Sequence, residues 1–177
     1  MNADVSARLA WPSDASAIAQ IQIAAWRQDY TDLLSTEVLL DLKAEQFTES
    51  WQASLNKPQD ARMRVLVALE RATVRGFALV HPSQDPDADA VSDSEIGEFV
   101  IDPLHRRAGH GSRLLQASID TLLADKFSRA LWWINASNDI LRTFVTGTGW
   151  ESDGAHRELQ NESGVSLKQI RLHTSLA

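Results

Sequence analysis

The sequence predicts an α/β domain built on one mixed sheet. Runs with strand character and runs with helical periodicity follow the order β, α, α, β, β, β, α, β, α, β, β, which gives about seven strands flanked by about four helices. The 177 residues suit a single domain, expected to span residues 1–177 and to bury a core. Hydrophobic residues at 44% and charged residues at 23% are ordinary for a globular chain, so disorder is not expected.

The first third of the chain is expected to be mainly helical. A short strand at residues 6–9 comes first, and the polar residues 13–14 can cap a helix whose apolar residues recur up to about Tyr30. Two further segments, residues 35–42 and 44–55, form either one broken helix or two short ones.

The middle of the chain predicts three strands. Apolar runs at residues 64–69 and 74–81 are joined by the polar residues 70–73, which indicates a hairpin. A third run, residues 95–101, reads as a buried strand that ends before Pro103, because proline cannot donate to a ladder.

The loop before this third strand is acidic. Asp85, Asp87 and Asp89 resemble the start of a calcium-binding loop. That motif requires glycine where Ala90 stands and glutamate where Ile96 stands. The segment is therefore interpreted as a solvated acidic loop.

A glycine-containing basic loop, residues 106–111, connects the third strand to a helix. Leu115, Ile119 and Leu122 recur along one side of that helix. The first helical turn carries N–H groups without partners and the positive end of the helix dipole, and the glycines let a ligand approach the backbone. Cationic side chains around the loop are Arg106, Arg107 and Arg113. The pattern predicts a phosphate or pyrophosphate site, although the six residues alone also fit a plain basic turn.

The last third returns to the sheet. Residues 130–135 predict a strand, and Asn138 caps a helix over residues 139–146. A strand from Trp150 and a strand over residues 165–173 complete a terminal hairpin.

Two blocks of the sequence together resemble the GNAT superfamily of acyl-CoA-dependent N-acetyltransferases. The segment Val100-Ile101-Asp102-Pro103, followed by Arg106-x-x-Gly109-x-Gly111-Ser112-x-Leu114-Leu115, is similar to the acyl-CoA-binding motif. Residues 138–144 and then Gly149-Trp150 are similar to the family's asparagine-led helix and following strand. A looser match begins at Trp26, so the resemblance covers nearly the whole chain and implies a GNAT-like, mostly antiparallel sheet.

The resemblance implies acetyl-CoA as cofactor and an acetyl transfer to a primary amine of a small molecule or peptide. An N–H, most simply that of Val100, would polarise the thioester carbonyl. The residues that the resemblance assigns to the cofactor are Phe99, Val100, Ile101, Arg106, Arg107, Ala108, Gly109, His110, Gly111, Ser112, Asn138 and Phe144.

The reaction needs a base, and two carboxylates in the central strand are candidates. Glu95 aligns with the glutamate that some family members use through a water molecule, and we favour it slightly. Glu98 is the alternative because it is nearer the loop, and either residue also fits a solvated or arginine-paired carboxylate. Side-chain alternation predicts that the two face opposite sides of the sheet.

The usual proton donor of the family is missing. Val145 stands where many relatives carry the tyrosine that protonates the departing thiolate. Tyr30 is the only tyrosine of the chain, and it can supply that proton or line the acceptor pocket. Trp26 is the other acceptor-binding candidate, and core packing is the plainer role for both residues.

Several classes of function are disfavoured by composition. The absence of cysteine excludes disulfides and a cysteine nucleophile, and the five histidines show no metal-ligand spacing, so no metal is expected. The net charge of −7 argues against nucleic-acid binding and is compatible with a cationic acceptor. No apolar run reaches the length of a membrane span and no signal peptide is evident, so a cytoplasmic location without membrane binding is expected. The sequence is compatible with a homodimer but does not predict the oligomeric state.

Two other functions compete with acetyl transfer. The first is a domain that binds acyl-CoA as a regulatory ligand without turning it over. The valine at residue 145 favours this alternative, because the usual proton donor is missing. The second is a dinucleotide dehydrogenase, but its fingerprint requires glycine where Leu114 stands and an acidic residue where Asn135 stands.

Overall fold

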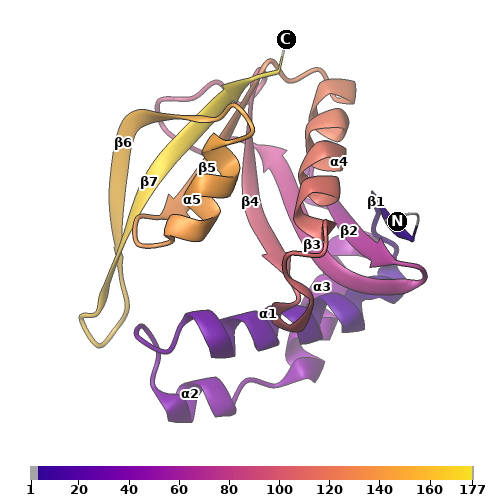
Figure 1. Ribbon diagram of the computed structural model, residues 1–177, viewed down its shortest axis with the longest axis vertical. Helices are drawn as coiled ribbons and strands as arrows, with labels where there is room; N and C mark the ends of the chain where they lie inside the picture. The colour runs from indigo at the N-terminus through magenta and orange to yellow at the C-terminus, as the bar shows by residue number, and fades with distance from the viewer. Residues whose placement is uncertain (1–3, 177) are drawn as a thin grey trace.

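The structure, a computed structural model, describes residues 4–176 and contains one seven-stranded sheet in the order β1-β2-β3-β4-β5-β7-β6 (Figure 1). The strands are β1 Val5–Leu9, β2 Arg64–Glu70, β3 Thr73–Pro82, β4 Asp93–Ile101, β5 Arg129–Asn135, β6 Glu151–Gln160 and β7 Ser166–Ser175. Every neighbouring pair is antiparallel except β4 and β5, which are parallel. The predicted mixed and mostly antiparallel sheet is confirmed.

Five α-helices accompany the sheet within the described residues, one more than predicted. They are α1 Ala15–Asp29, α2 Thr36–Leu40, α3 Ala44–Asn56, α4 His110–Ala124 and α5 Asp139–Thr146, with 3₁₀ turns at Pro12–Asp14 and Pro103–His105. The extra helix arises because the segment between residues 35 and 56 forms two helices. Ser35 caps α2 by accepting a hydrogen bond from the N–H of Val38, and the chain breaks before α3 begins.

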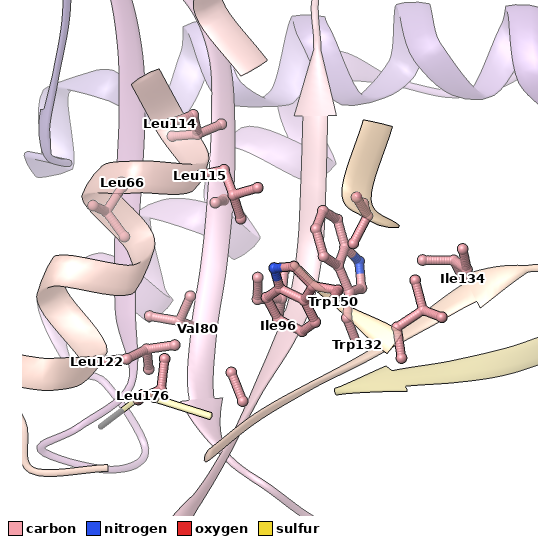
Figure 2. Packing of buried hydrophobic residues seen from close by; sticks show 14 of the residues in the cluster. Leu66, Val80, Ile96, Leu114, Leu115, Leu122, Trp132, Ile134, Trp150 and Leu176 are labelled. Carbon is pink, nitrogen blue, oxygen red and sulfur yellow. The ribbon is translucent and has the colours of Figure 1, made fainter. Parts of the chain in front are cut away.

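One face of the sheet carries the larger core, under α4 and α5. Figure 2 shows Leu122 of α4 beside Val80 of the sheet, and the rings of Trp132 and Trp150 together near Ile96. These side chains are fully or almost fully buried. Burial of this apolar area supplies the main stabilisation of the α4 side of the domain.

The opposite face is covered by α1 and α3 over β2 and β3. Ile18 and Ile21 of α1 pack against Val67 and Phe77 of the strands. No residue of α3 is fully buried, so this helix lies less closely on the sheet than α1 does.

A β-bulge at Gly97 changes which side chains of β4 share a face. Ile96 lies opposite Val80 and Glu98 lies opposite Leu79, so Gly97 is the extra residue. The bulge resets the alternation, and Glu98 therefore lies on the same face as Glu95, the face covered by α1. The prediction that the two carboxylates face opposite sides was wrong, because it assumed an unbroken strand.

Candidate active site

An unpaired strand edge lies at the centre of the sheet. The parallel ladder between β4 and β5 joins Asp93–Ile96 to Arg129–Trp132 and stops there. Residues 97–101 of β4 therefore have no partner on the β5 side, and Figure 1 shows the two strands diverging. An extended ligand can pair with such an edge as an added strand.

The loop that follows β4 presents bare amide groups to one place. Gly109 adopts a left-handed conformation, with φ at 88°, and forms the N-cap of α4. Among residues 4–176, no N–H from Arg106 to Ser112 donates a hydrogen bond to the protein. These amides and the positive end of the α4 dipole are available to an anion, the ligand that the sequence predicts for this loop.

The cationic side chains of this loop are not equivalent. Arg106 forms an ion pair with Asp29 at the end of α1, at 3.0 Å, so part of its charge is neutralised. Arg107 has φ at 62° and, like Arg113, forms no ion pair within the described residues. The predicted basic surrounding of the loop therefore rests chiefly on these two arginines.

The His110 side chain does not belong to the anion site. It is 1% exposed, and both ring nitrogens lack a hydrogen-bond partner among the described residues. Burial lowers the pKa of His110, so the ring is neutral near pH 7. Only the backbone N–H of this residue can serve the predicted cofactor site.

The two sequence blocks that resemble the family meet in space. A Cβ built on Gly111 would lie 3.7 Å from Cζ of Phe144, so the ring of α5 faces the start of α4. Val145, the next residue, is completely buried in the core. The side chain of Asn138 caps α5 by accepting a hydrogen bond from the N–H of Leu141 at 3.1 Å.

Glu98 is near enough to Tyr30, the residue that caps the C-terminal end of α1, for its charge to act on the Tyr30 hydroxyl. Burial raises the pKa of Glu98, and its carboxylate makes no hydrogen bond within the described residues. Burial also raises the pKa of Tyr30, and the negative charges of Glu98 and Asp29 raise it further. The Tyr30 hydroxyl is therefore protonated at neutral pH and can act as a proton donor.

Glu95 lies on the same face but in a different setting. It is buried, and its Oε2 accepts long contacts from the Ser83 hydroxyl at 3.4 Å and from the N–H of Gln84 at 3.5 Å. The loop after β3 thus holds this carboxylate, whereas no hydrogen bond from residues 4–176 holds that of Glu98.

Aromatic side chains extend this site along α1. The Trp26 ring contacts the rings of Tyr30 and Phe47, with centroids 5.7 and 5.3 Å apart. Trp132 is not part of this surface, because it is buried on the α4 side, while the register places Trp133 on the α1 side. Trp26 and Tyr30, the two acceptor-binding candidates, are thus in contact with each other.

The acidic loop is anchored rather than simply solvated. Arg171 of β7 forms ion pairs with Asp85, Asp87 and Asp153, at 3.0, 2.7 and 2.6 Å. The indole N–H of Trp133 also donates to Asp85, at 2.9 Å. The interpretation of this segment as a solvated loop needs that correction. The sequence did contain a signal for this anchoring, because Arg171 stands in a predicted strand among residues expected to pack on the core.

The tip of the β6–β7 hairpin encloses the α1 side of the sheet. The side-chain amide of Asn161 donates to the carbonyl of Leu33 at 2.8 Å. Figure 1 shows the hairpin tip reaching the segment between α1 and α2. The candidate site is thus bordered by α1, β4 and this hairpin.

Among residues 4–176, no group of three or more histidine, cysteine, aspartate or glutamate side chains is arranged to hold a metal ion. None of the described helices is both long and apolar enough to cross a membrane.

Comparison with known proteins gave a family match. Residues 22–146 match the acetyltransferase (GNAT) family. The uncharacterized N-acetyltransferase YuaI of Bacillus subtilis is 24% identical over 95% of this chain and 91% of its own length. A mycothiol acetyltransferase of Kineococcus radiotolerans is 32% identical over 57% of this chain, a match that covers 27% of that protein.

Solved structures agree in fold. YncA of Salmonella typhimurium, determined with its cofactor acetyl-CoA, superposes with a TM-score of 0.75 at 18% identity, over 98% of this chain and 95% of its own. A ribosomal-protein-alanine N-acetyltransferase of Brucella melitensis gives 0.75 at 20% identity, over 96% of this chain and 98% of its own.

Proposed function

Because the chain belongs to the acetyltransferase (GNAT) family, we propose that it transfers the acetyl group of acetyl-CoA to a primary amine of a small molecule or peptide. The observation that carries the proposal is the run of unpaired N–H groups from Arg106 to Ser112, beside the unpaired edge of β4. Acetyl-CoA is the acetyl donor of this family.

The residues present fit this donor. The free amides suit its diphosphate, and residues 97–101 of β4 suit its amide-containing arm. Gly111 leaves the backbone open, with Phe144 as the nearest side chain. Bound there, acetyl-CoA supplies a thioester whose carbonyl carbon accepts the amine and whose thiolate departs. We assign to the N–H of Val100 the stabilisation of negative charge that develops on the carbonyl oxygen.

We assign the role of base to Glu98. A primary amine is protonated at neutral pH and must lose a proton before it can attack. A carboxylate whose pKa is raised by burial, and which no hydrogen bond holds, accepts a proton more readily than an ordinary one. Glu95, held by Ser83 and Gln84, is the second candidate and would act through a water molecule. Two carboxylates on one face also attract a cationic acceptor.

We assign the role of proton donor to Tyr30. Its raised pKa keeps the hydroxyl protonated, and it lies near Glu98. A valine occupies the usual tyrosine position and is buried away from the site, so Tyr30 is the phenol available among the described residues. A thiolate with an ordinary pKa near 8.5 leaves readily, so loss of this donor should reduce turnover only moderately.

The test is release of coenzyme A in the presence of amines. The chain has no cysteine, so a thiol reagent reports only released coenzyme A. We expect Glu98→Gln to lower kcat at least about 100-fold and Glu95→Gln to lower it less, with acetyl-CoA binding retained by calorimetry. The reverse ranking would assign the base to Glu95. Binding of acetyl-CoA without release against any amine would contradict the proposal and favour a regulatory acyl-CoA-binding role.

A further inference from the structure

A groove of about 540 Å³ lies between α3 and the edge of the sheet formed by β1, β2 and β3. It exists because α3 buries none of its residues completely, so the helix leaves space over the strands. A groove of this volume is in the range that takes a small organic molecule. Among the residues that line it are Gln22, Phe47, Trp51, Leu55, Met63 and Leu79.

Residues of the groove's lining are direct neighbours of the candidate active site. Leu79 lines it and lies directly opposite Glu98 in the β3–β4 ladder, so the two side chains share a face. Gln22 also lines it, and Gln22, Trp26 and Tyr30 follow one another at four-residue spacing along one side of α1. The Phe47 ring, another part of the lining, contacts Trp26 edge-on. The groove therefore borders the site at Leu79, beside Glu98, and at Phe47, beside Trp26.

The lining carries no unpaired charge. Its only ionised side chain is Arg64, which is paired with Asp125 at 2.8 Å. The other polar groups of the lining are amides and hydroxyls. A charged ligand segment would lose its hydration here without gaining a counter-charge, so the groove selects against it.

The polar groups that remain suit a neutral ligand. The Oε1 of Gln22 accepts a hydrogen bond from the indole N–H of Trp51 at 2.8 Å, which fixes both side chains. The Nε2 group of Gln22 donates no hydrogen bond within the described residues, so it is free for a carbonyl or ether oxygen. The Trp51 and Phe47 side chains offer aromatic surface.

We propose that this groove binds the body of the acceptor, and that the acceptor is an amine whose distal part is uncharged and apolar or aromatic. The inference rests on the proposed acetyl transfer and adds to it the class of amine. The amine lies at the Glu98 end and the neutral body lies between α3 and the sheet. A polycation is excluded from the groove by the absence of unpaired carboxylates in its lining.

Three amines and one groove-filling variant test this proposal. The amines are 2-phenylethylamine, ethylamine and the polycation spermidine. We expect kcat/KM for 2-phenylethylamine to exceed the other two at least about tenfold. Ser54 lies in the lining, so Ser54→Trp should lower the ratio of kcat/KM for 2-phenylethylamine to that for ethylamine about tenfold. Gln52 is exposed on α3 outside the lining, and Gln52→Trp should keep the wild-type ratio.

The outcomes separate this inference from the proposed function. An unchanged ratio in Ser54→Trp, or spermidine as the best substrate, would overturn the inference while acetyl transfer stands. If no amine is acetylated, the proposed function fails. Binding of 2-phenylethylamine to the groove is then tested directly, by calorimetry in the presence of coenzyme A. A Kd about tenfold weaker in Ser54→Trp than in Gln52→Trp would support the groove, and equal Kd values would refute it.

Discussion

A Cβ on residue 97 would lie 2.6 Å from Nε2 of His81, so only glycine fits between β4 and the imidazole. The ring has little freedom to move away, because its Nδ1 lies 2.7 Å from the carbonyl oxygen of Pro82. Gly97 is the bulged residue that brings Glu95 and Glu98 to one face. The absence of a side chain at this position therefore supports the geometry of the candidate site.

Gly97→Ala should lower both stability and activity. The added methyl group must displace the His81 ring or the bulge, and overpacking of this kind costs about 1–3 kcal/mol. Urea denaturation measures the loss of stability. The double variant Gly97→Ala with His81→Ala should regain part of it, because the obstructing ring is gone. No loss in the single variant would show that the bulge absorbs the methyl group.

Glu98→Gln should make the protein more stable at pH 7. The pKa of Glu98 is raised on folding, so the folded chain holds its proton more tightly than the unfolded chain does. The free energy of unfolding then falls as pH rises from the ordinary value of 4.5 through the raised pKa. The glutamine variant lacks this loss. Thermal unfolding from pH 4 to 8 should show the two proteins diverging as pH rises, and a constant difference would contradict the raised pKa.

Arg171→Met should be strongly destabilising. The guanidinium is buried and is the partner of Asp85 and Asp153, whose side chains are 11% and 12% exposed. Removing it leaves two largely buried carboxylates without a counter-charge, although Asp85 keeps its hydrogen bond from Trp133, and the loss of a buried ion-pair partner costs about 3–5 kcal/mol. Asp87→Asn is the matched control, because that partner is 64% exposed, and it should change stability much less. Denaturant unfolding measures both variants. Equal losses in the free energy of unfolding would show that the burial of an ion pair does not determine its contribution to stability.

The strands, the glycine-containing basic loop and the two family blocks were predictable because each is local in sequence. Local features determine the conformation of nearby residues: these are the apolar runs, the proline after β4 and the glycines at the start of α4. The mixed, mostly antiparallel sheet was predicted through the resemblance, since periodicity alone does not pair distant segments. The order of the strands and the proximity of Gly111 to Phe144 were not predicted.

The rest depended on contacts between distant residues. Period-two alternation misplaced Glu98 because one extra residue in β4 inverts every later side chain, although a glycine inside a strand was a signal of a bulge. Arg171 and Asp85 lie 86 positions apart, and no local pattern pairs them. The neutral groove under α3 was equally hidden, because it follows from how loosely a helix packs.

Asp29→Asn should strengthen binding of coenzyme A. Asp29 neutralises Arg106 beside the anion site, and its own negative charge opposes a diphosphate. The two side chains are 45% and 39% exposed, so losing the pair should change stability by less than about 1 kcal/mol. Calorimetry at low salt should show a Kd several-fold lower, and the gain should vanish near 0.5 M salt. Asp32→Asn is the control for charge alone, and weaker binding in Asp29→Asn would mean that the pair instead holds the loop in place.

Gly111→Ala should separate folding from cofactor binding. The new methyl group would meet only the Phe144 ring, at an ordinary contact distance of 3.7 Å, and alanine is favoured over glycine within a helix by up to about 1 kcal/mol. The unfolding temperature should therefore stay equal or rise. The same methyl group stands beside the free amides at the start of α4, so the Kd for coenzyme A should increase about tenfold. Pantetheine, which lacks the diphosphate, should bind both proteins equally. If coenzyme A also binds both equally, the diphosphate does not lie against the start of α4, and the assignment of the amides from Arg106 to Ser112 would be wrong.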